Sequence, residues 1–148
     1  MTQPAVHLET SVGLALKQAA AALRTAMDAA LRPLDLGVSQ YACLEQLRHR
    51  PGLSAAELAR ATFVTRQSMH AVLQGLQERG LLTRPATAPA GRALPTELTT
   101  AGASLLDRAS RAVAEVEQRM LTALSAPAAA RLQQDLLACV AALEAQAR

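Results

Sequence analysis

Aromatic residues are nearly missing from this sequence, which has one tyrosine, one phenylalanine and no tryptophan. Its apolar content, 51% of 148 residues, is mainly alanine, leucine and valine, and alanine and leucine strongly favour helices. Helices with such small side chains bury little area per residue, so they gain from packing on a second subunit. We therefore expect a single domain that is mainly α-helical, with one small β element.

Long uncharged apolar runs are also missing. No stretch reaches the roughly 18 apolar residues of a membrane span, and residues 1–16 lack the basic segment and apolar run of a signal peptide. The two cysteines, Cys43 and Cys139, lie far apart, and there is no Cys-x-x-Cys motif or Cys/His cluster. This argues against a disulfide framework or a zinc ribbon, so we expect a cytoplasmic protein with reduced thiols.

Motifs for catalysis and cofactor binding are lacking as well. The sequence has no Gly-x-Ser-x-Gly, His-Glu-x-x-His, Walker or dinucleotide-binding motif. His7, His49 and His70 fall in three different predicted elements and do not assemble a metal-binding cluster. The sequence therefore predicts neither an enzyme nor a bound cofactor or metal.

Lysine is nearly absent, because Lys17 is the only one, and arginine carries most of the positive charge. The net charge of the chain is +3, yet residues 40–95 alone hold seven arginines and only three acidic residues. A basic middle between nearly neutral helical flanks indicates a part that binds a polyanion. A solvated, arginine-rich surface is the alternative interpretation.

Apolar residues recur every three or four positions through most of the chain, a spacing that predicts helices. The predicted helices cover residues 5–31, 39–49, 55–61, 66–79, about 103–124 and the chain from 127 onward. Alternating residues predict short strands at 81–84 and 94–98, and Pro95 makes the second an edge strand. Ser54 and Glu57 form a capping box, Thr65 caps the following helix, and Gly80 stops it.

A short helix, a tight turn, a second helix and a hairpin thus follow one another. In this order the second helix projects from the surface, where it fits the major groove of B-form DNA with its N-terminal residues at the base edges. Gln67 suits adenine, and Arg66 suits guanine or phosphate. The candidate DNA contacts at this helix start are Thr65, Arg66, Gln67, Ser68 and His70.

The stretch from Leu53 to Gly102 resembles the MarR family of bacterial transcriptional regulators. It reads LSAAELARATFVTRQSMHAVLQGLQERGLLTRPATAPAGRALPTELTTAG, and LSAAELAR, TRQSMHAVLQGLQERGLLTR and LTTAG carry the resemblance. The resemblance implies a homodimer with a winged helix-turn-helix fold, mainly α with a small β-hairpin wing. About 38–102 would form the DNA-binding lobe, and about 1–36 and 103–148 the dimerisation helices. The apolar stripes of those helices also fit an ordinary core within one chain.

The predicted wing departs from the family pattern, which usually carries Asp-x-Arg at its tip. The matching residues here are Ala90, Gly91 and Arg92, so the resemblance implies that Arg92 meets the minor groove without an acid to orient it. Arg84, at the wing base, is a further candidate DNA contact. Arg79 matches a position that braces the lobe or touches the DNA backbone, or else it caps its own helix. Weaker candidates for phosphate contacts are Arg48, Arg50 and Arg60.

Proteins of this family often bind a small anionic or phenolic effector between the dimer layer and the lobe. Tyr41 is the candidate ligand-binding residue, in a pocket that the scarcity of aromatics predicts to be aliphatic. Cys43 is expected to be a buried structural thiol, with redox sensing as the alternative.

We predict a homodimer that binds double-stranded DNA sequence-specifically, as a repressor released by a small-molecule effector. The alternative is a helical dimer with a weakened wing that acts through protein–protein contacts.

Overall fold

The computed structural model describes residues 4–84 and 95–147 and has the mainly α fold with a small β-hairpin that the sequence predicts. The α-helices are α1 (Val12–Leu31), α2 (Val38–His49), α3 (Ala55–Thr62), α4 (Arg66–Glu78), α5 (Thr100–Met120) and α6 (Ala126–Gln146). The strands are β1 (Leu82–Thr83) and β2 (Glu97–Leu98), and the short 3-10 helices are η1 (Leu8–Thr10), η2 (Arg32–Leu34) and η4 (Leu121–Ala123).

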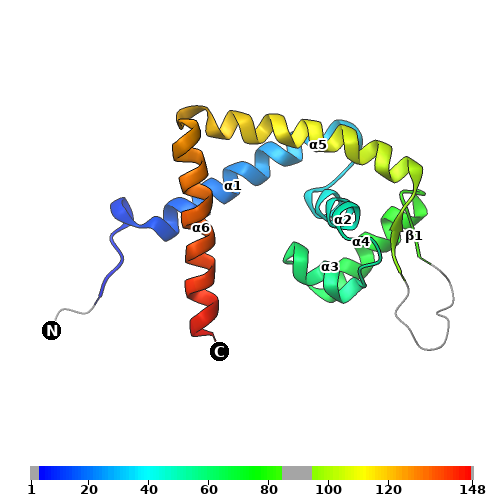
Figure 1. The fold of residues 1–148 in the computed structure, drawn as a ribbon, viewed down its shortest axis with the longest axis horizontal. Coiled ribbons are helices and arrows are strands. Elements are labelled where there is room, and N and C mark those ends of the chain that lie inside the picture. The colour runs from blue at the N-terminus through cyan, green and yellow to red at the C-terminus, as the bar shows by residue number, and fades with distance from the viewer. Residues whose placement is uncertain (1–3, 85–94, 148) are drawn as a thin grey trace.

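The molecule has two structurally different parts (Figure 1). The first, which we call the lobe, consists of α2, α3, α4 and the antiparallel β1–β2 hairpin, and it lies beneath the N-terminal half of α5. The second consists of the terminal helices: α1 runs beside α5, and α6 turns sharply away from the end of α5 and extends alone. The lobe therefore has neighbours on several sides, whereas α6 has few within its own chain.

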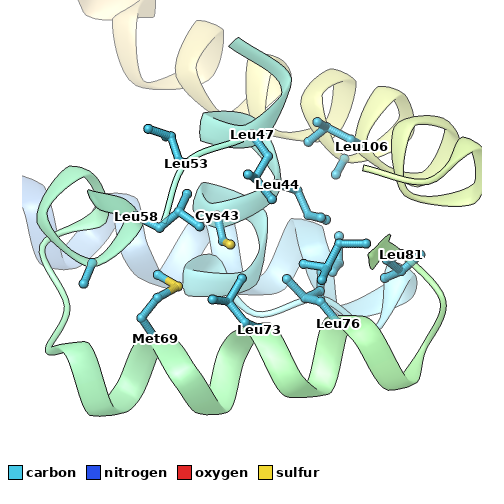
Figure 2. Close-up of a cluster of buried hydrophobic side chains, with 14 of the residues drawn as sticks. Cys43, Leu44, Leu47, Leu53, Leu58, Met69, Leu73, Leu76, Leu81 and Leu106 are labelled. Atoms are coloured by element: carbon cyan, nitrogen blue, oxygen red, sulfur yellow. The ribbon is translucent and has the colours of Figure 1, made fainter. Parts of the chain in front are cut away.

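Leucine side chains from several elements meet in the core of the lobe (Figure 2). Leu44 of α2, Leu58 of α3, Leu73 of α4 and Leu106 of α5 are all fully buried. Complete burial of a leucine side chain stabilises a fold by roughly 1.5–3 kcal/mol. This core holds α4 by its inner face and leaves the opposite face outside.

The predicted caps of the lobe helices are confirmed. Ser54 Oγ accepts a hydrogen bond from the Glu57 amide at 3.2 Å, and the Glu57 carboxylate accepts one from the Ser54 amide at 3.4 Å. Thr65 Oγ1 accepts from the Ser68 amide at 3.0 Å at the start of α4. Gly80 follows the end of α4 with φ +72°, a left-handed conformation that suits glycine.

The hairpin is tied directly to the start of α5. The Thr99 amide donates to the Leu81 carbonyl at 3.2 Å, and Thr99 Oγ1 donates to the Gly80 carbonyl at 2.6 Å. The first turn of α5 then passes so close to the chain before β1 that a Cβ atom on Gly102 would collide with the Leu81 carbonyl. Glycine at position 102 therefore permits this close approach.

Several predicted boundaries are wrong. α1 begins at Val12 rather than at residue 5, because Ser11 Oγ caps it by accepting from the Leu14 amide at 3.1 Å. α5 begins at Thr100 and ends at Met120, where η4 replaces the helix that was expected to continue to residue 124. β1 begins at Leu82 rather than at Leu81 because the Leu81 amide still bonds to the Leu76 carbonyl at the end of α4, and β2 begins only at Glu97.

Candidate nucleic-acid interface

The start of α4 points out of the protein. Met69, Leu73 and Leu76 are completely buried on the inner face of α4, and Figure 2 shows this helix on the side of the core opposite α5. Residues on the other face of a helix then point to solvent. The exposed residues include Thr65, Arg66, Gln67, Ser68 and His70, which are the predicted DNA contacts at this helix start.

Two of these five residues also hold the start of α4 in place. Thr65 Oγ1 accepts from the Ser68 amide and donates to Ser68 Oγ at 2.9 Å. The Thr65 proton is thus used within the protein, whereas the Ser68 hydroxyl can still donate outward. The donors and acceptors of Arg66, Gln67 and His70 therefore make up most of the hydrogen-bonding capacity of this surface.

A surface hollow of about 330 Å³ lies beside α4 and is lined partly by basic side chains. We call it the basic hollow. Its lining residues are Ser54, Ala55, Ala56, Arg66, His70, Arg84 and Thr96. The structure thus brings Arg84, at the base of the hairpin, next to Arg66 and His70 of α4. The Ser54 hydroxyl already donates to Glu57 Oε1 at 2.9 Å. Two guanidinium groups and an imidazole can together receive an anionic oxygen such as that of a phosphate.

Sequence reasoning missed part of this hollow. The sequence pattern predicts only a capping role for Ser54, although it lies at the same surface as Arg66 and Arg84. Thr96 is almost fully buried, and its carbonyl accepts from the Gly52 amide at 3.1 Å, which joins the hairpin to the loop before α3. Such neighbours come from three separated segments, so spacing along the chain could not reveal them. Arg92, the predicted wing-tip contact, lies outside the described residues together with Ala90 and Gly91.

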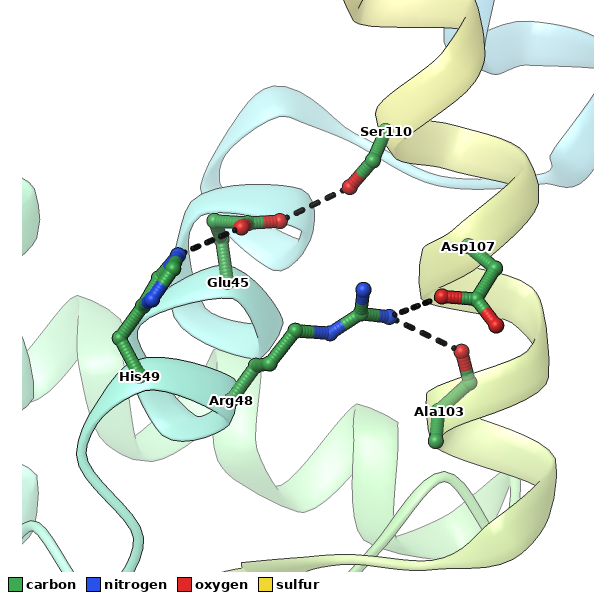
Figure 3. Close-up of polar contacts among 6 residues, drawn as sticks. All are labelled: Glu45, Arg48, His49, Ala103, Asp107 and Ser110. Atoms are coloured by element: carbon green, nitrogen blue, oxygen red, sulfur yellow. Dashed lines mark hydrogen bonds and ion pairs between the residues drawn. The ribbon is translucent and has the colours of Figure 1, made fainter.

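Three other arginines make contacts within the chain. Arg48 of α2 forms an ion pair with Asp107 of α5 at 2.8 Å and donates to the Ala103 carbonyl at 3.1 Å (Figure 3). Arg79 donates to the Asp35 carbonyl at 2.6 Å and the Leu34 carbonyl at 3.4 Å, which confirms the bracing role over the capping role. Arg50 donates to Gln46 Oε1 at 3.2 Å. Arg48 therefore joins α2 to α5 through these contacts.

Tyr41, the predicted ligand-binding residue, is half-buried between α2 and α5. Partial burial raises the pKa of its phenol; a hydrogen bond with Ser110 opposes this shift, and the charge of Glu45 adds to it. Ser110 Oγ donates to Glu45 Oε2 at 2.9 Å, and Glu45 Oε1 also contacts His49 Nε2 at 3.0 Å (Figure 3). Tyr41 thus belongs to a polar contact between α2 and α5, and its role toward a ligand stays a prediction.

Cys43 is completely buried, and desolvation raises the pKa of its thiol to about 12. A thiol with such a pKa stays protonated and is a poor nucleophile at neutral pH. This supports a structural role over redox sensing. Cys139 is exposed on α6. Residues 4–84 and 95–147 contain no group of three or more His, Cys, Asp or Glu side chains that could hold a metal ion.

A second hollow, of about 230 Å³, lies between α1 and α5. We call it the α1–α5 hollow. Apart from the Arg119 guanidinium its lining is aliphatic: Ala19, Ala22, Leu23, Ala26, Val116, Arg119 and Met120. This lining contains no residue of α2, so the predicted pocket beside Tyr41, between the dimer layer and the lobe, stays a prediction. An apolar hollow with one cationic group suits a small apolar acid.

Large apolar side chains are exposed on the terminal helices. Leu8 and Val12 at the start of the chain, and Leu137 and Leu143 on α6, are all more than half exposed. Surfaces of this kind mark protein–protein interfaces. No helix in the described part of the chain is long and apolar enough to cross a membrane.

Comparison with known proteins agrees with this geometry. A sequence profile described as MarR family matches residues 34–93. The HTH-type transcriptional repressor Rv2887 of Mycobacterium tuberculosis is 42% identical over 119 residues, which cover 80% of this chain and 86% of the repressor. A crystal structure of Rv2887 in complex with DNA has a TM-score of 0.75 and 37% identity, covering 88% of this chain and 98% of that one. A crystal structure of Rv2887 with salicylic acid has a TM-score of 0.73 and 39% identity, covering 88% and 96%.

Proposed function

The chain belongs to the MarR family, and we propose that it is a transcriptional repressor that binds double-stranded DNA sequence-specifically as a homodimer, without catalysis. The outward, polar start of α4 carries this proposal: its inner face is fixed by Met69, Leu73 and Leu76, so its outer face is free to enter a major groove. The similar repressor Rv2887 has been crystallised with DNA. A regulator of this kind works in the cytoplasm.

The homodimer is supported by the apolar surface of the terminal helices. α6 has no buried residue and α1 buries only Leu31 within the chain. A second copy would cover these faces and hold two lobes apart, so that two α4 helices reach half-sites about 34 Å apart on the DNA. We assign about 1–36 and 103–148 to the dimer layer and about 38–102 to DNA binding.

The contacts to DNA divide into two groups. Gln67, exposed on the outer face of α4, is the proposed base-reading residue, because an amide can bond to adenine with a donor and an acceptor. Arg66, His70 and Arg84 line the basic hollow between α4 and the hairpin. The sugar-phosphate backbone between the major and minor grooves would pass through this hollow. We therefore propose that these three residues contact DNA phosphates. Arg92 keeps its proposed role at the minor groove.

We further propose that a small aromatic or apolar acid releases the repressor from DNA. Rv2887 has been crystallised with salicylic acid, and the α1–α5 hollow offers an aliphatic lining with Arg119 to receive a carboxylate. Tyr41 does not line this hollow, and its contact with a ligand on α2 stays a separate proposal. Salicylate should weaken DNA binding, and Arg119→Gln should raise the salicylate concentration needed. Arg111→Gln, an exposed arginine on the same helix, is the matched control and should leave that concentration unchanged.

The experiment that tests DNA binding is selection of genomic fragments with the purified protein, followed by gel-shift titration of the selected site. Specific affinity should fall steeply with added salt, because phosphate contacts release counterions. Gln67→Ala should reduce discrimination at particular base pairs by about 1–3 kcal/mol. Gln77→Ala, at the exposed far end of the same helix, should not. Failure to enrich any sequence would contradict the proposal and favour a role in protein contacts.

A further inference from the structure

Phe63 is the single phenylalanine of the chain and occupies the turn between α3 and α4 with 94% of its surface exposed. It ends α3 in the left-handed conformation, with φ 59° and ψ 37°. The amides of Phe63 and Val64 both bond to the Ala59 carbonyl, so these backbone contacts close the turn without the phenyl ring. The phenyl ring therefore adds almost no packing to the fold.

A bulky residue is unfavourable in this backbone conformation. Side chains with a Cβ atom clash with the following carbonyl in the left-handed region, which glycine occupies freely and asparagine or aspartate tolerate. The other described positions with a positive φ follow this rule, because they hold Gly52, Gly80 and Asp35. Phe63 alone combines a strained backbone with an aromatic ring in water. Strain of this kind points to a role outside the folding of the chain.

The position of Phe63 indicates which surface the ring meets. It lies two residues before Thr65, the cap of α4, and three before Arg66, the first residue of that helix. The turn and the helix start therefore belong to one surface, next to Gln67. The dimer layer of α1, α5 and α6 lies elsewhere: Figure 1 shows α3 and α4 on the side of the lobe away from α5.

We infer that Phe63 is a DNA-contacting residue whose ring packs against apolar carbon at the rim of the major groove, beside the bases that Gln67 reads. This inference rests on the proposed function. The groove presents the C5-methyl group of thymine, a known partner for a phenylalanine ring, and its edge presents deoxyribose carbons. The ring thereby loses its exposure to water when DNA binds, and it contributes to site choice where thymine is the partner.

The test compares Phe63→Gly with the wild-type chain on the DNA site selected by the wild type. Glycine relieves the left-handed backbone, so the thermal midpoint of Phe63→Gly should equal or exceed that of the wild type. Its affinity for the site should nevertheless fall, by about tenfold if the ring is worth one base-pair contact. A loss of affinity without a loss of stability would separate a DNA contact from a structural role.

Asp35→Gly is the matched control, because it relieves the other left-handed residue that is not glycine and keeps the carbonyl that Arg79 bonds. It should not weaken DNA binding. Deoxyuridine in place of thymine then identifies the contact: the difference between wild type and Phe63→Gly disappears if the ring meets a thymine methyl, and persists if it meets deoxyribose. Equal affinity of Phe63→Gly and wild type overturns this inference alone. Absence of specific binding by the wild type overturns the proposed function with it.

Discussion

The lobe and the terminal helices have similar apolar periodicity in the sequence, but they differ in what covers the apolar side chains. In the lobe, Leu44, Leu58 and Leu73 are fully buried by the same chain. On α6, Leu137 is 61% exposed and Leu143 is 73% exposed. An apolar stripe therefore shows that a helix face is buried against a partner. It does not show whether that partner belongs to the same chain or to a second one.

This difference matches the proposed roles of the two parts, which are DNA binding by the lobe and dimerisation by the terminal helices. A core closed within one chain supports α4 rigidly, so the positions of Gln67 and Arg66 do not depend on a partner. Open apolar faces on α1 and α6 leave the spacing of two lobes to the dimer contact. A ligand that alters the dimer layer can thus change DNA binding without disturbing the core of either lobe.

The largest effect is expected when the exposed apolar face of α6 is made polar. Leu132→Asp with Val140→Asp should prevent dimer formation, since each unpaired carboxylate in an apolar interface costs at least about 2 kcal/mol. Sedimentation equilibrium should then show single chains, and specific DNA binding should be lost. Gln134→Asp with Ala138→Asp adds the same charge on the other face of α6 and should leave the dimer intact. A wild-type chain that sediments as a monomer would contradict the premise.

The next largest effect is expected from the closed core. Leu73→Ala should lower the free energy of unfolding by about 2–5 kcal/mol, because it leaves a cavity between α4 and α2. Chemical denaturation measures this loss. Leu143→Ala should be made in the monomeric variant that carries Leu132→Asp and Val140→Asp. There it should change the free energy of unfolding of the single chain by less than about 0.5 kcal/mol. Similar losses for the two substitutions would remove the distinction between the parts.

The buried thiol of Cys43 predicts a pH dependence of the lobe. The folded pKa is about 12, against 9.0 for the unfolded thiol, so the stabilisation is fully present below pH 9 and is lost as the pH rises toward 12. The unfolded state ionises first and gains about 1.4 kcal/mol per pH unit, or about 2 kcal/mol at pH 10.5. Tyr41, whose pKa is also raised, acts in the same direction.

Denaturation at pH 8 and pH 10.5 measures this loss, and Cys43→Ala supplies its control. The alanine variant should be less stable at pH 8 but should lose less stability between the two values. An equal loss in both proteins would exclude the thiol as the source.

The smallest effect is expected at the polar contact that joins the lobe to α5. Asp107→Asn removes the charge opposite Arg48, but Arg48 keeps its hydrogen bond to the Ala103 carbonyl. Because both side chains are partly exposed, the free energy of unfolding should fall by less than about 1 kcal/mol. A loss of several kcal/mol would show that the lobe and α5 depend on this ion pair far more than its exposure suggests.

Much of the lobe could be predicted because its signals are local. The capping box at Ser54 and Glu57, the cap at Thr65 and the stop at Gly80 each depend on residues within four positions of one another. The basic hollow could not be predicted, because Ser54, Arg66 and Arg84 come from segments that only the folded chain brings together. The sequence also does not show that Asp107 lies opposite Arg48, so Arg48 is predicted as a phosphate contact although it pairs with Asp107.

The amino-acid sequence alone specifies the order of the helices, which side of each is apolar, and that the start of α4 is polar; except at the start of α1, it also places their ends to within a few residues. These properties follow from backbone geometry and from side chains close together in the chain. The folded structure is needed to show that Leu73 is buried while Leu143 is exposed, that Arg84 lies beside Arg66, and that the side chain of Phe63 is exposed. Burial and long-range contact depend on how the elements pack, because apolar area is removed from water only where two surfaces meet.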